Sequence, residues 1–580
     1  MSKLASLTAE QVATLTTAQI SQIKPATWTG LRTDQLQALT TEQVVALSTS
    51  QLRSFSPDVL SALTTEQVSV IEVGDLATLT TSQMIGWSTA QIQALTTAQV
   101  QGLLGTQWVG FSQEQVQALS TLQMAAIETR DIAALKTQQV SALGTDQIRA
   151  LDTAQVTSLT TQQVGSLTDA QVASLRTEQL AAFETRDVVA MNANQFAAMT
   201  TAQVAGLTVG QIAVVETRDI AGWSADQVKA LTTDQVVAMT QSQVASLSAD
   251  QLSGLSTTQI AVIETADLVS MSTAQYAVLQ SDQLRALTDT QIQAIETRDI
   301  NALSQDQISS LQTAQVAAMS TLQMSKIGSQ QLTGLTSAQL QAIATDDIAV
   351  LETANIRALG ESMAVFTSVQ VPQLQSHQIR ALSSDQVGIL VSDQLRALST
   401  DQLGYFQTTQ IAGLQAEQLN TLKTEQVAAL TSSFLVALSS DQIASLSTAQ
   451  LMAVTSAQIP AIETGDWAAL TSDQINVLTS VQTNALLTQQ IAAITSDQAS
   501  SYSIGLLNAW SSSQWQALTN SAVSAFSTTQ IQGLATAQIA ATSTRQWQGI
   551  TSDQMPALTT AQLVQMSTAG AAVLNSEQLS

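Results

Sequence analysis

Large apolar residues recur at every eighth position along almost the whole chain. The series begins at Leu7, Leu15 and Ile23 and continues to Leu359. With this anchor as position 0, the octad has Thr or Ser at +1, a small residue at +2 and a variable residue at +3. Gln follows at +4, then Val, Ile or Leu at +5, a variable residue at +6 and Ala, Gly or Ser at +7. About 72 such octads follow one another, so the sequence predicts a repeat architecture.

A period of eight fits neither a continuous helix nor a strand. Eight residues turn an α-helix by about 800°, so the apolar stripe would drift by about 80° in each octad. Positions 0, +5 and +7 also break the two-residue alternation that a strand requires. A short helix that restarts in every octad is the interpretation that remains.

Several local rules place the start of that helix at the same residue. Thr or Ser at +1 with Gln at +4 forms a capping box, and the apolar pair at 0 and +5 forms a hydrophobic staple. Pro25 and Pro57 fall at +2, the first helical position, where proline is tolerated. Proline at +6 is incompatible with a helix interior, so either a single turn or a 3-10-like conformation is predicted at Pro372, Pro460 and Pro556.

Helices of one or two turns are unstable alone because nucleation is costly, so neighbouring octads must stack. We therefore predict an all-α solenoid of very short helices, one per octad, with positions 0, +5 and +7 in its core. Three or four octads are expected in each superhelical turn. Gln at +4 is assigned only to its own cap, so the loss of one such residue is expected to cost little.

The octad register changes once, within the sequence LGESMAVF. Phe366 follows Leu359 by only seven residues, and the series resumes at Leu374. We divide the chain into a first-register solenoid over 1–359, the slip over 360–373 and a second-register solenoid over 374–580. The two solenoids are expected to form one continuous superhelix.

Composition excludes several classes of function. The net charge of −25 disfavours binding to nucleic acid or to an anionic membrane surface. The chain has no cysteine and a single histidine, His377, so sites built on thiolates or several imidazoles are excluded. The common catalytic motifs do not occur, so we expect no enzyme, no catalytic residue and no cofactor. No apolar run is long enough for a membrane span, and no cleavable N-terminal signal is expected.

A variant octad concentrates carboxylates. In the ETRD octads Glu occupies +1 and Asp occupies +4, with Arg at +3. Such a ladder of carboxylates is a candidate Ca²⁺ site because Ca²⁺ prefers oxygen ligands. The interpretation that we favour is a variant cap in which Arg offsets the charge. The residues concerned are Glu128, Asp131, Glu184, Asp187, Glu216, Asp219, Glu296 and Asp299.

The tandem phrase LTTAQV, found for example at 95–100, resembles large repetitive bacterial proteins of the surface or adhesion type. The acidic, cysteine-free composition, rich in Ala, Thr and Ser, is similar to that of surface-layer proteins. The resemblance covers the whole chain and implies a location outside the cell or at its surface. A cytoplasmic location is the alternative.

The leading hypothesis is a non-enzymatic structural protein that self-assembles, end to end or laterally, into an extracellular filament, sheath or surface layer. Its expected partner is another copy of the same chain. The first alternative is a monomeric scaffold or adhesin spacer that binds a partner on one face. The irregular stretches 359–378 and DQASSYSIGLLNAW are then the best candidates for that face. An ice- or mineral-ordering surface is a remote alternative.

The octad register can be tested by deletion. Removing the four residues 160–163 shifts every later anchor by half an octad, which brings polar positions into the core. We expect a lower melting temperature by circular dichroism, whereas removal of the complete octad 160–167 preserves the register and serves as the control. An unchanged melting profile after the half-octad deletion would contradict the assignment.

Overall fold

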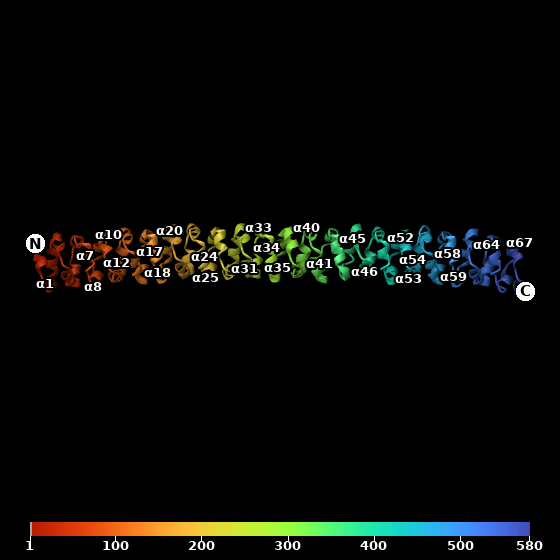
Figure 1. Cartoon of the computed structure of the whole chain (residues 1–580), viewed down its shortest axis with the longest axis horizontal. Helices are drawn as coiled ribbons and strands as arrows, with labels where there is room; N and C mark the ends of the chain where they lie inside the picture. The colour runs from red at the N-terminus through yellow and green to blue at the C-terminus, as the bar shows by residue number, and fades with distance from the viewer. Residues whose placement is uncertain (1–2) are drawn as a thin grey trace. The chain divides into compact units, whose positions relative to one another are not determined.

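One very short helix forms in nearly every octad. The computed structural model describes residues 3–580, and these contain 68 α-helices, five 3-10 helices and no strand. Every α-helix in this range begins two residues after an anchor and ends five to seven residues after it, from α1 (Ala9–Ala13) to α68 (Ser576–Leu579) (Figure 1). The predicted all-α solenoid of very short helices is confirmed.

The chain divides into two compact units, one up to Ile295 and the other from Glu296 onward. The first contains η1 (Lys3–Ser6) and the helices from α1 to α36 (Asp289–Ala294). The second contains the helices from α37 (Thr297–Ala302) to α68, together with the four remaining 3-10 helices. The division that we drew from the register stays a prediction.

Within each unit the chain coils so that helices three octads apart lie side by side. In the first unit α31 (Ala249–Gly254) packs against α28 (Ala225–Lys229) and α34 (Thr273–Val278) (Figure 1). In the second unit α41 (Ser329–Gly334) packs against α38 (Gln305–Ser309) in the same way. A helix too short to persist alone is thus held between the turns before and after it.

The local rules read from the sequence hold in the structure. Helix α3 (Pro25–Trp28) begins at its proline, and so does α7 (Pro57–Leu60). The octads with proline at +6 form single 3-10 turns, as predicted. These turns are η3 (Val371–Gln373), η4 (Ile459–Ala461) and η5 (Met555–Ala557).

The core consists of positions 0, +4 and +5. In one octad Leu39 and Val44 are buried, and Gln43 between them is only 2 % exposed. The assignment of +7 to the core is wrong for most octads, since residues such as Ala46 are half-buried. Position +7 lies instead against the +2 residue three octads earlier, and a Cβ at Gly102 would overlap the Val73 side chain. Small residues at +7 therefore allow close approach of adjacent turns.

The register slip is accommodated by one glycine. Leu359 has helical dihedral angles, whereas an anchor such as Leu335 is extended, so α44 (Thr353–Ala358) passes directly into η2 (Gly360–Val365). Gly360 has a φ of 51°, in the left-handed region that only glycine occupies without strain. The buried Met363 and Phe366 then fill the core of the shortened unit.

Two glycine-to-alanine substitutions separate backbone strain from packing. A Cβ meets no atom within 4 Å at either Gly360 or Gly210, but only Gly360 has a positive φ. We expect Gly360→Ala to lower the free energy of unfolding by about 1 kcal/mol because alanine is strained there. Gly210→Ala, within α26 (Val209–Val214), is expected to be neutral or slightly stabilising. Urea denaturation of both variants is the measurement, and equal effects would contradict the role of Gly360.

Candidate functional site

The glutamine at +4 completes the capping box of its own helix. At α5 (Thr41–Val45) the backbone N–H of Gln43 donates to Thr40 Oγ1 at 3.2 Å, and the backbone N–H of Thr40 donates to Gln43 Oε1 at 2.8 Å. Both bonds satisfy backbone donors that a helix start leaves unpaired. This part of the geometry is the one that the sequence predicts.

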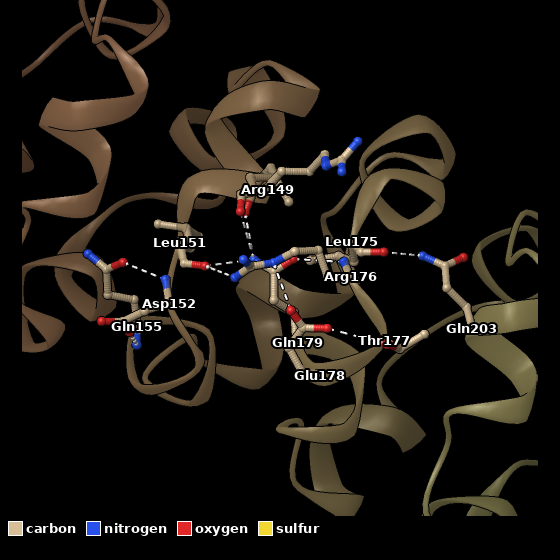
Figure 2. Close-up of polar contacts among 11 residues, drawn as sticks. Arg149, Leu151, Asp152, Gln155, Leu175, Arg176, Thr177, Glu178, Gln179 and Gln203 are labelled. Atoms are coloured by element: carbon tan, nitrogen blue, oxygen red, sulfur yellow. Dashed lines mark hydrogen bonds and ion pairs between the residues drawn. The ribbon is translucent and has the colours of Figure 1, made fainter.

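The same side chain also joins successive turns of the coil. Gln179 in α22 (Thr177–Ala181) donates from Nε2 to the carbonyl oxygen of Leu151 at 2.8 Å (Figure 2). It also donates to the carbonyl oxygen of Ile148 at 3.0 Å. These acceptors lie 28 and 31 residues earlier, so one turn of the coil contains between three and four octads. We call these repeated bonds the glutamine ladder. Further rungs of the same kind include Gln43, Gln99, Gln203, Gln331, Gln490 and Gln554.

Each rung connects two backbone ends that a short helix cannot satisfy by itself. Oε1 accepts from the N–H at the start of its own helix, and Nε2 donates to carbonyls at the C-terminal end of a helix four octads earlier. The expectation that glutamine serves only its own cap is therefore wrong. Losing one buried rung leaves several buried backbone groups without partners, and each such group costs about 1–3 kcal/mol.

The ladder continues through the register slip with shorter separations. Gln370 donates to the carbonyls of Leu340 and Ile343, 30 and 27 residues earlier, and Gln378 has the same separations. At Gln394 the separations return to 31 and 28 residues. Between Gln378 and Gln394, Gln386 donates only to the carbonyl of Ile356, 30 residues earlier. The missing residue is therefore absorbed within one turn, with one second acceptor lost.

The carboxylates predicted as calcium candidates form an ion-paired group within each ETRD octad. In α16 (Thr129–Ala134), Arg130 Nη2 lies 2.9 Å from Glu128 Oε2, and Arg130 Nε lies 3.6 Å from Asp131 Oδ2. Arginine thus offsets the charge, as the favoured interpretation predicts. The remaining groups are Glu184–Arg186–Asp187, Glu216–Arg218–Asp219 and Glu296–Arg298–Asp299.

The cap in these octads differs from the one that we predicted. Glu128 has the extended backbone of an N-cap residue, but its carboxylate accepts no capping bond because it is turned toward Arg130. Glu184, Glu216 and Glu296 also lack a side-chain cap. In these octads the Glu at +1 is therefore a partner for arginine and not a substitute for threonine.

The aspartates at +4 occupy buried rungs of the ladder. Asp131, Asp187 and Asp219 are at most 2 % exposed. Burial raises the pKa of Asp131 and of Asp219 above the ordinary carboxyl value; the neighbouring Arg130 and Arg218 oppose this shift. An ionised carboxylate has no hydrogen to donate, so an aspartate in that form cannot make the bonds that glutamine makes to the earlier turn.

Other candidate chemistry remains dispersed. His377 lies exposed in α45 (Ser376–Ala381). Residues 3–580 contain no group of three or more His, Cys, Asp or Glu side chains placed to hold a metal ion. The Ca²⁺ site therefore stays a prediction.

Parts of this tandem array also match a known repeat. Seven segments of the chain match the ALTTAQ repeat. They are residues 68–104, 124–161, 180–217, 260–294, 292–328, 363–400 and 459–496. These ALTTAQ segments cover less than half of the chain but occur in both compact units, so the chain is a tandem-repeat protein. No curated protein matches the chain.

The described part of the chain, residues 3–580, includes no helix with the length and apolar content needed to cross a bilayer.

The sequence does contain a signal for the ladder that local rules overlook. A capping box accepts Glu as readily as Gln at this position. In this chain +4 is Gln in most octads and never Glu, and the acidic exceptions are all Asp. Such a preference indicates that the amide hydrogens are required, and hence that an acceptor exists outside the octad.

A single ladder rung can be tested by exchanging its amide for a carboxylate. Gln203 donates to Val172 and Leu175 at 2.8 and 2.6 Å and has no charged residue at its cap. We expect Gln203→Glu to lower the free energy of unfolding by about 2–4 kcal/mol at neutral pH, because two donors are lost and a charge is buried. Gln162→Glu, at an exposed +3 position, is the matched control. Equal urea midpoints would contradict the ladder.

Proposed function

We propose that the chain is a non-enzymatic structural scaffold that joins further copies of itself end to end, forming a filament or layer outside the cell. The tandem-repeat scaffold is the observed part of this statement. The assembly, the lack of an enzymatic activity and the location are proposed. The proposed partner is chemically the simplest one, a second copy of the same octads.

The direction of the glutamine ladder carries the proposal. Every rung runs from an amide donor to carbonyls nearer the N-terminus, for example from Gln99 to Val68 and Ile71. Each turn therefore presents donors on its N-terminal side and acceptors on its C-terminal side. These two surfaces are complementary to each other but not to themselves, and such a head-to-tail contact does not close into a dimer.

The first and last described octads carry these two surfaces. Gln11 and Gln19 complete their capping boxes but are exposed, whereas Gln35 and the later rungs are buried. At the other end Leu563 and Leu579 are 45 % and 67 % exposed, although the +5 position that they occupy is buried in most octads. Docking one copy on another would give Gln11 and Gln19 carbonyl acceptors and would bury Leu563.

The use of polar groups supports a structural role over a catalytic one. The buried glutamines are engaged with backbone groups of two turns and are thus unavailable for chemistry. The hydroxyls at +1 are similarly committed, since Thr40 Oγ1 accepts from its own helix. This orientation also counts against the ice- or mineral-ordering alternative, which requires hydroxyls turned outward.

One observation favours the alternative of a monomeric platform that binds a partner. Two surface hollows in the second unit lie at the irregular stretches singled out from the sequence. One, of about 370 Å³, is lined by Pro372, Leu374, Gln375 and Tyr405 among others. The other, of about 530 Å³, is lined by Leu487, Ala509, Trp510 and Ser511 among others.

End-to-end assembly can be tested by placing charge on the donor surface. The double variant Gln11→Glu/Gln19→Glu would set carboxylates against the carbonyls of a second copy, which is unfavourable. We expect the unmodified chain to form concentration-dependent polymers in sedimentation velocity and electron microscopy, and the double variant to remain monomeric.

Gln37→Glu/Gln93→Glu is the matched control, because it adds the same charge at exposed +6 positions. This control is expected to polymerise like the unmodified chain. A chain that stays monomeric at every concentration would overturn the assembly and favour the monomeric platform.

A further inference from the structure

Six buried aspartates each leave one carboxylate oxygen without a hydrogen-bond partner. In Asp131 and Asp219 this oxygen lies in an ion pair with the neighbouring arginine, at 3.6 and 3.4 Å. All six occupy the +4 rung position, where glutamine would present two N–H donors to the earlier turn. They are Asp131, Asp187, Asp219, Asp267, Asp347 and Asp466. A buried oxygen without a donor is unusual in a native fold and calls for a specific explanation.

Asn355 shows how a side chain of the same length fits the rung. It is 2 % exposed, and its Nδ2 donates to the carbonyl oxygen of Ile327, 28 residues earlier, at 2.9 Å. Its Oδ1 accepts from Ser329 Oγ, 26 residues earlier, also at 2.9 Å. A four-atom side chain therefore reaches the same acceptor as glutamine, provided that one of its two terminal atoms carries a hydrogen.

Some of the aspartates already reproduce half of this arrangement. Asp187 Oδ1 accepts from Thr161 Oγ1 at 3.1 Å, and Asp466 Oδ1 accepts from Ser440 Oγ at 2.7 Å, both 26 residues earlier. The second oxygen is the unpartnered one in both residues. By elimination it is the counterpart of the Nδ2 atom of Asn355, which carries the hydrogens that a carboxylate lacks.

We propose that Asp267 and Asp347, which are buried at +4 with no arginine beside them, are proton-dependent rungs of the ladder. In its neutral form each aspartic acid takes one proton from solvent and donates it to the carbonyl 28 residues earlier, as the Asn355 amide does. In its ionised form the rung is broken, because a carboxylate oxygen faces a carbonyl oxygen. The coil is therefore held more tightly in acid than at neutral pH.

The surroundings of Asp267 illustrate the balance of charge. Asp267 is 4 % exposed in α33 (Thr265–Ser270), and burial, followed by the charge of Glu264, raises its pKa. The packed helix α30 (Gln241–Ala245) has no ionisable residue, and α36 contributes only Asp289. Helix α29 (Thr233–Val237), which precedes the carbonyl 28 residues before Asp267, contributes only Asp234. Every charge on these elements is therefore negative.

The sign of the pH effect follows from the direction of the shift. A carboxyl whose pKa is higher in the folded chain than in the unfolded chain destabilises the fold when it ionises. Its stabilising contribution is complete below the unfolded pKa and is lost as the pH rises through the folded pKa. The same sign holds at Asp347, where burial raises the pKa although a hydrogen bond from Thr321 opposes the shift.

The proposal can be tested at one rung of the full-length chain. Hydrogen exchange with mass spectrometry would give the protection of residues 263–271 between about pH 7 and about pH 4, a range that spans the titration of a carboxyl with a raised pKa. In the unmodified chain we expect protection to rise several-fold on acidification. In Asp267→Asn it should already be high at neutral pH and should no longer change with pH.

Two further variants complete the test. Asp289→Asn, on the packed helix α36 but exposed, is the control and should keep the pH response of the unmodified chain. Asn355→Asp should create a new pH-dependent loss of protection at residues 351–359. If Asp267→Asn weakens protection at neutral pH, or leaves its pH dependence intact, the proposal is overturned.

Discussion

The bonds of the glutamine amide to two turns of the backbone are the interaction on which the rest of the structure depends. Each octad helix has only four to six residues, so almost all of its backbone groups lie near an unpaired end. Apolar contacts at 0 and +5 bring the turns together but cannot satisfy these groups. The buried amide at +4 satisfies both backbone donors and backbone acceptors. Its oxygen accepts from an N–H at a helix start, and its nitrogen donates to carbonyls at earlier helix ends.

This division of roles explains why the coil can have a polar core position in most repeats. A buried side-chain amide is destabilising unless it is hydrogen-bonded. In each regular rung the oxygen and both amide hydrogens find backbone partners, so the desolvation of the glutamine is offset where it occurs. The stability of the coil is then spread over contacts between adjacent turns, as in other solenoids.

The sequence predicts those features whose cause lies within one octad. Helix starts, proline positions and the 3-10 turns all follow from residues no more than seven positions apart, and the structure confirms them. The second role of Gln43 could not be read in this way, because its acceptors Val12 and Leu15 are distant in the chain and any residue has a carbonyl. Only the absence of Glu at +4 carried that information.

The candidate ETRD site was predictable to the same extent. Arginine lies two residues from the glutamate and next to the aspartate, so their pairing follows from local spacing. The environment of each aspartate does not follow from local spacing, because it depends on the residue 26 positions earlier. That residue is Thr161 for Asp187 but Gly105 for Asp131, and only the first offers a hydroxyl.

The fixed separation of the ladder has a consequence for how such a chain changes length. The acceptors of each rung lie at a fixed sequence separation toward the N-terminus. Any octad supplies suitable carbonyls there, whatever its side chains. Duplication or loss of whole octads in a gene therefore leaves every other rung with an acceptor. A partial repeat is different: the seven-residue unit at Gly360 has no Gln at +4 and needs a left-handed glycine. Selection on length can thus act in steps of eight residues, almost independently of selection on the surface.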